Sequence, residues 1–165
     1  MSLETRVSIA EAEQLIKEAF LRNGVKEAVA ESVSNALVAA EAEGQVGHGF
    51  SRVKDYLAQV KSKKINVDAK IKIEHPKPTS ISIDADYGFA YPALDQAISE
   101  GALTAKEYGS AIVSIFNSHH CGALSVQVEK IANQGLIGVM MANTPKAIAP
   151  WGCLLYTSPS PRDED

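Results

Sequence analysis

Apolar residues in the first 64 positions recur at helical spacing. Ser8 and Glu11 form the capping box S-x-x-E, which predicts a helix start, and Asn23-Gly24 predicts its end. A second helix is predicted over residues 26–43, and a third after the glycine-rich turn GQVGHG. In the first two helices we expect these side chains to face inward: Ile9, Ala12, Leu15, Ile16, Phe20, Val29, Val33, Leu37 and Val38.

Beyond residue 64 the spacing changes from helical to alternating. KIKIEH and SISIDA alternate apolar and polar residues, which predicts two half-exposed strands around Pro76-Lys77-Pro78. A turn is predicted at Asp86-Tyr87-Gly88. Further helices are predicted over residues 90–108 and 123–134, and buried strands over residues 110–116 and 136–142. In the first of these helices we expect Leu94, Ala97, Ile98 and Leu103 to face inward.

This alternation of helices and strands predicts an α/β fold: a helical N-terminal segment, residues 1–64, followed by a mixed α/β layer, residues 65–152. Residues 153–165, CLLYTSPSPRDED, are polar and proline-rich, so we expect a disordered tail. This tail is also similar to the translation of a sequencing-library adapter. On that interpretation Cys153 is not a natural residue, and the chain is a truncated fragment.

Composition and charge narrow the possible partners. The net charge is −4 and the basic residues form no cluster, which argues against nucleic acid as the main partner. The apolar runs are shorter than the roughly 18–20 residues of a membrane span. The polar N-terminus has no signal-peptide pattern, and two cysteines make no disulfide framework. We therefore expect a cytoplasmic protein that is not bound to membranes.

The stretch GHGFSRVKDY contains a candidate site for a small anion. His48, Arg52 and Tyr56 follow an i, i+4, i+8 spacing, which places them on one face of a helix. The planar fork of arginine can hold a carboxylate through two hydrogen bonds. The alternative is that this face is an ordinary solvated surface.

The stretch NSHHCG, residues 117–122, offers candidate chemistry at the end of an apolar strand. Adjacent side chains on a strand point to opposite faces, so His119 and His120 should not share a metal ion, and no H-x-x-x-H or C-x-x-C spacing is present. Cys121 is poorly placed for activation by a neighbouring histidine. One histidine acting as a general acid or base remains, or a structural histidine bonded to Asn117 or Ser118.

No G-x-G-x-x-G follows a strand and no G-x-x-x-x-G-K-[ST] is present, so an ordinary Rossmann or P-loop site is not indicated. The two stretches above, together with IDADYGFAYPALDQAI and ANTPKAIAPWG, resemble the malate/L-lactate dehydrogenase family over residues 7–152. The resemblance implies a non-Rossmann fold, an intertwined homodimer and NAD or NADP as cofactor. It also implies an enzyme that interconverts 2-hydroxy acids, or related imino acids, with 2-oxo acids or reduced products.

The resemblance also implies roles for individual residues. The motif histidine falls on His48, and the arginine and tyrosine that bind substrate fall on Arg52 and Tyr56. The proton-transferring histidine falls on His120, with His119 at a variable position and a packing neighbour like Cys121. The cofactor side of the cleft falls on Asn143, Thr144 and Pro150.

Two departures from the family pattern stand out. Gly47 replaces a serine that is often found before the first histidine, which removes a hydroxyl from the substrate pocket. The chain also stops near the middle of a family member, so we expect it to be inactive alone. Two other function classes stay open: a non-catalytic, self-associating α/β module and a histidine-dependent hydrolase. The uncovered strand at residues 136–142 should favour aggregation.

Overall fold

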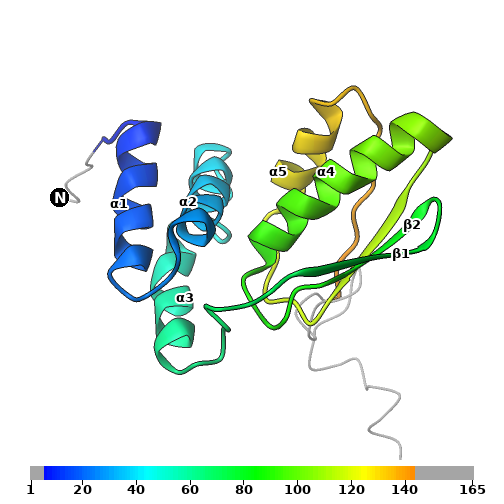
Figure 1. Ribbon diagram of the computed structural model, residues 1–165. Helices are drawn as coiled ribbons and strands as arrows, with labels where there is room; N and C mark the ends of the chain where they lie inside the picture. The colour runs from blue at the N-terminus through cyan, green and yellow to red at the C-terminus, as the bar shows by residue number, and fades with distance from the viewer. Residues whose placement is uncertain (1–5, 144–165) are drawn as a thin grey trace, which may run out of the picture.

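The computed structural model describes residues 6–143, which form three N-terminal helices followed by a small sheet with two further helices (Figure 1). This mixture confirms the predicted α/β fold. Thr144, Pro150 and the tail from residue 153 lie outside the described residues. The elements are α1 Ile9–Leu21, α2 Glu27–Ala42, α3 Ser51–Lys61, β1 Lys72–Lys77, β2 Ser80–Asp84, α4 Ala90–Tyr108, β3 Ile112–Phe116 and α5 Leu124–Ala132.

Helix α1 begins at the predicted capping box. The Glu11 backbone N–H donates to Ser8 Oγ at 3.2 Å, and the Ser8 backbone N–H donates to Glu11 Oε2 at 2.8 Å. The inward stripe is narrower than predicted: Ala12, Ile16 and Phe20 are buried, whereas Ile9 and Leu15 are 60% and 61% exposed. The reason is that α1 packs along a single stripe on α2, so positions beside that stripe face water.

The sheet has the strand order β1-β2-β3. β1 pairs with β2 in an antiparallel hairpin, whereas β2 pairs with β3 in parallel, and α4 forms the crossover between them. Figure 1 shows α4 lying across this sheet. Ala93 and Ala97 of α4 pack with Ile81 and Ile83 of β2, so the small alanines of the helix cover the branched side chains on one face of the sheet. The sheet therefore presents the ends of β2 and β3 side by side.

Two predictions of burial around the sheet are wrong. β3 is not fully buried, because Ile112 and Phe116 are 74% and 47% exposed at alternate positions. α4 covers only the other face of this strand, which bears Val113 and Ile115. Leu103 of α4 is 64% exposed, because α4 turns that position away from the sheet.

Residues 136–142 do not form the predicted buried strand. Their exposure alternates as in a strand, but no ladder partner is present within residues 6–143. The side chains facing water are Ile137 at 98%, Val139 at 82% and Met141 at 88% exposed. A strand also needs a neighbouring strand that pairs with its backbone N–H and C=O groups. An apolar pattern in the sequence does not show whether such a neighbour is present.

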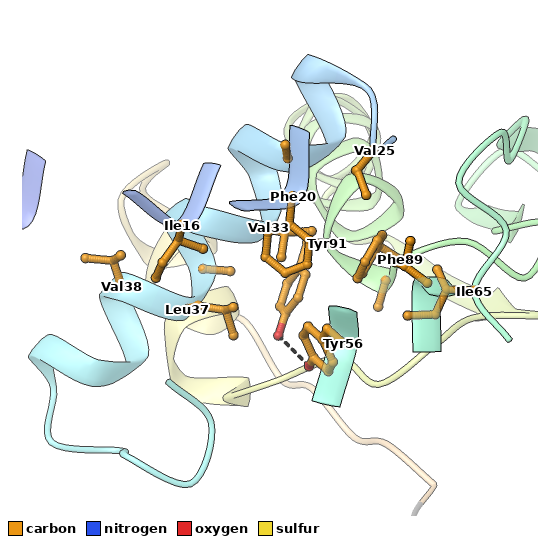
Figure 2. Packing of buried hydrophobic residues seen from close by; sticks show 14 of the residues in the cluster. Ile16, Phe20, Val25, Val33, Leu37, Val38, Tyr56, Ile65, Phe89 and Tyr91 are labelled. Atoms are coloured by element: carbon orange, nitrogen blue, oxygen red, sulfur yellow. Dashed lines mark hydrogen bonds between the residues drawn. The ribbon is translucent and has the colours of Figure 1, made fainter. Parts of the chain in front are cut away.

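The main core joins the three N-terminal helices to the start of α4, so it crosses the predicted boundary at residue 64 (Figure 2). Phe20 of α1 packs edge-on against Phe89, which precedes α4, with ring centroids 5.7 Å apart. Tyr56 of α3 packs against the same Phe89 ring at 5.8 Å. This packing fixes α3 relative to α4. None of the described helices is long and apolar enough to span a bilayer.

Candidate active site

The turn before α3 carries the first group of candidate residues. α3 begins at Ser51, so His48 lies in the turn rather than on the helix, which corrects the predicted single helical face. Gly49 lets this turn approach α2 closely, because a Cβ there would clash with the carboxylate of Glu41 and lie 3.0 Å from its Cα. The same carboxylate accepts a hydrogen bond from the Phe50 backbone N–H at 2.8 Å. The turn is therefore anchored on α2.

The loop after β3, residues 117–122, carries the second group. Asn117 has a positive φ of 49°, and its amide donates to Asp84 Oδ1 at 3.1 Å. Three backbone hydrogen bonds tie the loop to the turn after β2: Ala85 N–H to Phe116 O (3.0 Å), Tyr87 N–H to Asn117 O (2.7 Å) and His119 N–H to Gly88 O (3.2 Å). The parallel pairing thus continues past the strand ends and directs the loop toward α3.

His120 of this loop meets the residues from the turn and α3. Tyr56 Oη lies 2.7 Å from His120 Nδ1. The rings of His48 and His120 stack, with centroids 5.5 Å apart and planes 11° from parallel. Arg52 lies one helical turn before Tyr56 on α3, and its positive charge lowers the pKa of His120. His48, Arg52, Tyr56 and His120, which the sequence suggested for proton transfer and substrate binding, therefore come together. Tyr56 and His120 are 64 residues apart in the chain.

The surroundings of His120 favour its neutral form. Partial burial lowers the pKa of His120 below its ordinary value, and the positive charge of Arg52 and the neighbouring His48 ring lower it further. The Asn117 amide is bonded to Asp84, and the Ser118 hydroxyl donates to the His119 carbonyl, so neither of these side chains holds the His120 ring as the structural alternative required. A neutral imidazole near pH 7 can accept or donate a proton.

The prediction that His119 and His120 point to opposite faces is wrong. β3 ends at Phe116, so the strand alternation no longer applies, and both rings lie beside Tyr56, with centroids 5.2 Å and 6.2 Å away. His119 Nε2 is hydrogen-bonded to Gln59 Oε1. Burial, with smaller contributions from the charges of His120 and Lys64, lowers the pKa of His119 to about 4, so its ring is neutral and packs as expected.

Arg52 is oriented by its own turn. Its Nε donates to the Gly47 carbonyl at 2.6 Å, and one terminal nitrogen lies 3.9 Å from the Asp55 carboxylate. The side chain is 37% exposed, so its outer edge stays open to water. A guanidinium held through Nε in this way keeps terminal nitrogens for a ligand.

Sequence reasoning missed Tyr91, Gln59 and the contact of Gly122. Tyr91 Oη, in the first turn of α4, lies 3.0 Å from Tyr56 Oη, and both side chains are buried. A tyrosine among inward-facing alanines and leucines was the available signal, because a buried phenol needs a hydrogen-bond partner. Its partner lies 35 residues away in the chain, which the local pattern does not show.

On the proposed cofactor side, only Asn143 lies within the described residues, and its side chain is exposed. Cys121 is half-buried and packs against the main core, and burial raises the pKa of its thiol. Within residues 6–143, no group of three or more histidine, cysteine, aspartate or glutamate side chains is placed to hold a metal ion.

Comparison with solved structures shows the same fold in several oxidoreductases. The chain aligns with the δ1-piperideine-2-carboxylate reductase from Pseudomonas syringae pv. tomato with a TM-score of 0.76 and 32% identity, covering 80% of this chain and 40% of that one. It aligns with malate dehydrogenase from Pyrococcus horikoshii OT3 with a TM-score of 0.75 and 28% identity, covering 79% and 38% of the two chains.

Sequence comparison gives a consistent result. The chain is 38% identical over 146 residues to (2R)-3-sulfolactate dehydrogenase (NADP(+)) from Chromohalobacter salexigens, covering 88% of this chain and 44% of that protein. It therefore spans less than half the length of this relative. The family described as malate/L-lactate dehydrogenase matches residues 7–154, which confirms the resemblance seen in the motifs. The chain belongs to the malate/L-lactate dehydrogenase family.

Proposed function

We propose that the longer protein to which this chain corresponds is an NAD(P)-dependent oxidoreductase that interconverts a 2-hydroxy acid, malate- or lactate-like, and its 2-oxo acid. The observation that carries this proposal is the convergence of His120 with Tyr56, 2.7 Å away, and with the stacked ring of His48, at the end of a parallel strand pair and one helical turn from Arg52 on α3. The present chain spans 44% of the sulfolactate dehydrogenase relative, and we propose that it is inactive alone.

In the proposed reaction the terminal nitrogens of Arg52 hold the substrate carboxylate. His120 takes the proton of the C2 hydroxyl as the C2 hydride leaves with its electron pair, which leaves a C2 carbonyl. His48 and Tyr56 orient the reacting groups, Tyr56 through its hydrogen bond to His120. In the reverse direction His120 returns the proton. A positioned acid or base contributes typically about 10²–10⁴-fold in rate.

The cofactor supplies the hydride acceptor. The proton-transfer half of the reaction fits the residues present, because His120 is neutral and lies at an exposed position of the loop. We propose Asn143, Thr144 and Pro150 for the cofactor side. Related proteins are named for both cofactors, NADP(+) in the sulfolactate dehydrogenase and NAD(+) in ureidoglycolate dehydrogenase from Escherichia coli, so we propose NAD or NADP.

The family membership also supports proposals about organisation. We propose a homodimer of the full-length protein, located in the cytoplasm and acting on small acids rather than nucleic acid. The division into residues 1–64 and 65–152 is proposed as an organisation of the sequence, and the main core joins the two parts.

The proposal is tested by replacing His120 in the full-length protein. His120→Ala should lower turnover of a 2-hydroxy acid by about 10²-fold or more, while NAD(P)H still binds, because only the proton acceptor is lost. His75→Ala, an exposed histidine on β1, is the matched control and should retain turnover. Near-normal turnover of His120→Ala would contradict the proposal.

The role of Arg52 is tested by substrate preference. Arg52→Met keeps the length of the side chain but removes the charged fork, so we expect poor use of the carboxylate substrate and little change with its uncharged amide. Lys54→Met, at an exposed position of the same helix, controls for loss of a positive charge. An unchanged preference between acid and amide would exclude a carboxylate-binding role for Arg52.

A second function is supported by the exposed apolar residues 136–142. We propose that this chain by itself is a self-associating α/β module without catalysis, because Ile137, Val139 and Met141 are exposed to water. Titration of the chain with NAD(P)H, followed by cofactor fluorescence, separates the two functions. We expect little change of fluorescence from this chain, whereas a saturable change would show that the cofactor side is already formed.

A further inference from the structure

Three aromatic side chains form a hydrogen-bonded series behind the proposed acid/base. Tyr91 Oη lies 3.0 Å from Tyr56 Oη, which in turn lies 2.7 Å from His120 Nδ1. Figure 2 shows the two tyrosine hydroxyls pointing toward each other from α4 and α3. Both tyrosines are 2% exposed, so water has little access to either hydroxyl. Hydrogen bonding within this series therefore determines where its protons lie.

One direction of donation satisfies both hydroxyl protons. If Tyr91 donates to Tyr56, Tyr56 can donate to the lone pair on Nδ1 of neutral His120. If Tyr56 instead donates to Tyr91, the buried hydroxyl proton of Tyr91 has no other acceptor among residues 6–143. An unpaired buried donor costs free energy. Burial raises the pKa of both tyrosines, so both stay protonated and able to donate. The favoured neutral His120 therefore accepts at Nδ1 and carries its proton on Nε2.

A separate contact links Tyr91 to the loop that bears His120. Gly122 has a φ of +69°, and a Cβ at this position would lie 2.5 Å from Tyr91 Oη and 2.9 Å from its Cε1. The loop backbone thus rests directly on the Tyr91 ring, two residues after His120. Tyr91 reaches His120 by two routes, through the hydroxyl of Tyr56 and through the loop backbone.

We propose that Tyr91 is a positioning residue of the active site, which acts through Tyr56 to hold His120 by Nδ1. In the resting state Nε2 carries the ring proton, so before Nε2 can take a substrate proton the ring must exchange to its Nδ1–H tautomer and Tyr56 must turn from donor to acceptor. Tyr56 is then a positioning residue as well, because its buried hydroxyl is committed to Tyr91 and His120 rather than open to a ligand. The catalytic role of His120 rests on the proposed function, whereas the hydrogen-bonded series is a property of this chain by itself.

The charged and titratable groups around His120 decide how the proposal can be tested. Arg52 and His48 act on its ring from α3 and the preceding turn, and His119 precedes it in the loop. None of these is altered by removing a tyrosine hydroxyl. Tyr56→Phe should raise the pKa of His120 by about 0.5–1 pH unit, because the neutral ring loses its donor at Nδ1. Tyr91→Phe should raise it by a smaller amount, since Tyr56 becomes a weaker donor.

The measurement is an NMR titration of the histidine ring signals of this chain, which requires neither turnover nor cofactor. The double variant Tyr56→Phe/Tyr91→Phe should match Tyr56→Phe alone, because Tyr91 acts through Tyr56. Ring nitrogen shifts should show an unprotonated Nδ1 in the unaltered chain. Tyr108→Phe, an exposed tyrosine near the end of α4, is the matched control and should leave His120 unchanged.

Three results would overturn the proposal: an unshifted His120 in Tyr56→Phe, an additive shift in the double variant, or a proton on Nδ1 of the neutral ring. The thermal midpoint of each variant shows that its fold is retained. Because the titration does not involve catalysis, loss of the oxidoreductase proposal would leave this result standing, and the reverse is equally true.

Discussion

At the residue scale, burial gives two adjacent histidines different properties. His120 is the more exposed of the two and is bonded to Tyr56, whereas His119 is more deeply placed between Tyr56 and Phe89 and is bonded to Gln59. Both pKa values are lowered, and that of His119 reaches about 4. The two rings thus have different partners: His120 bonds to Tyr56, whereas His119 attaches the loop to α3 through Gln59.

The low pKa of His119 predicts a loss of stability in acid. Between about pH 6.5, the ordinary histidine pKa, and about pH 4, the unfolded chain binds a proton that the folded chain does not. The neutral His119 ring therefore contributes fully to the free energy of unfolding above about pH 6.5, and this contribution is lost as the pH falls through about 4. His119→Phe keeps an aromatic ring but no titratable group, so its urea midpoint should fall less between pH 7 and pH 4.5. An equal fall in both chains would contradict this.

The spacing of polar residues predicted which of them meet, but not how they are bonded. His48, Arg52 and Tyr56 could be grouped from their positions in one short stretch, and His120 from its place at a strand end. Tyr91 and Gln59 could not be grouped with them, because those contacts span 35 and 60 residues and depend on how helices pack. Periodicity describes one element at a time.

At the element scale, the same limit explains the errors in the fold. The capping box and the strand alternation determined where elements begin and which residues share a face, and the structure agrees. Which face is covered depends on neighbouring elements: Leu15 and Leu103 fit a helical stripe but lie outside the contact with α2 or the sheet. Residues 136–142 fit a strand but lack a paired neighbour within the described residues.

The connection between β3 and α5 gives a prediction at this scale. Gly122→Ala places a Cβ against Tyr91 in a left-handed backbone conformation, so we expect a loss of about 2–4 kcal/mol in the free energy of unfolding. Gly135→Ala, at φ +78° with open space around the Cβ, should cost only about 1 kcal/mol. Urea unfolding of both variants measures the difference. Equal losses would show that the contact with Tyr91 has no energetic effect.

At the scale of the whole molecule, apolar surface is uneven. The sheet face covered by α4 is well packed, whereas the outer positions of β3 and residues 136–142 place large apolar side chains in water. The chain spans 44% of its sulfolactate dehydrogenase relative. The core is sufficient for the helices, but the sheet face opposite α4 is left exposed to water.

This exposure predicts self-association of the isolated chain. The pair Ile137→Lys/Val139→Lys should shift sedimentation toward the monomer without lowering the melting temperature, because these side chains are 98% and 82% exposed. Asn133→Lys/Gln134→Lys adds the same charge at exposed positions nearby and should leave association in place. Reduced association in both pairs would point to charge rather than apolar contact.

The backbone hydrogen bonds that hold the loop after β3 have a consequence for substitutions within it. Phe116 and Asn117 accept from the turn after β2 through carbonyls, which every residue type has, and His119 donates to it through a backbone N–H, which only proline lacks. Apart from Asn117, His119 and Gly122, which contact neighbouring elements, the path of the loop therefore depends on its backbone rather than on its side chains. Single substitutions at the remaining loop positions, Ser118 and Cys121, are therefore expected to alter the surroundings of His120 without redirecting the loop.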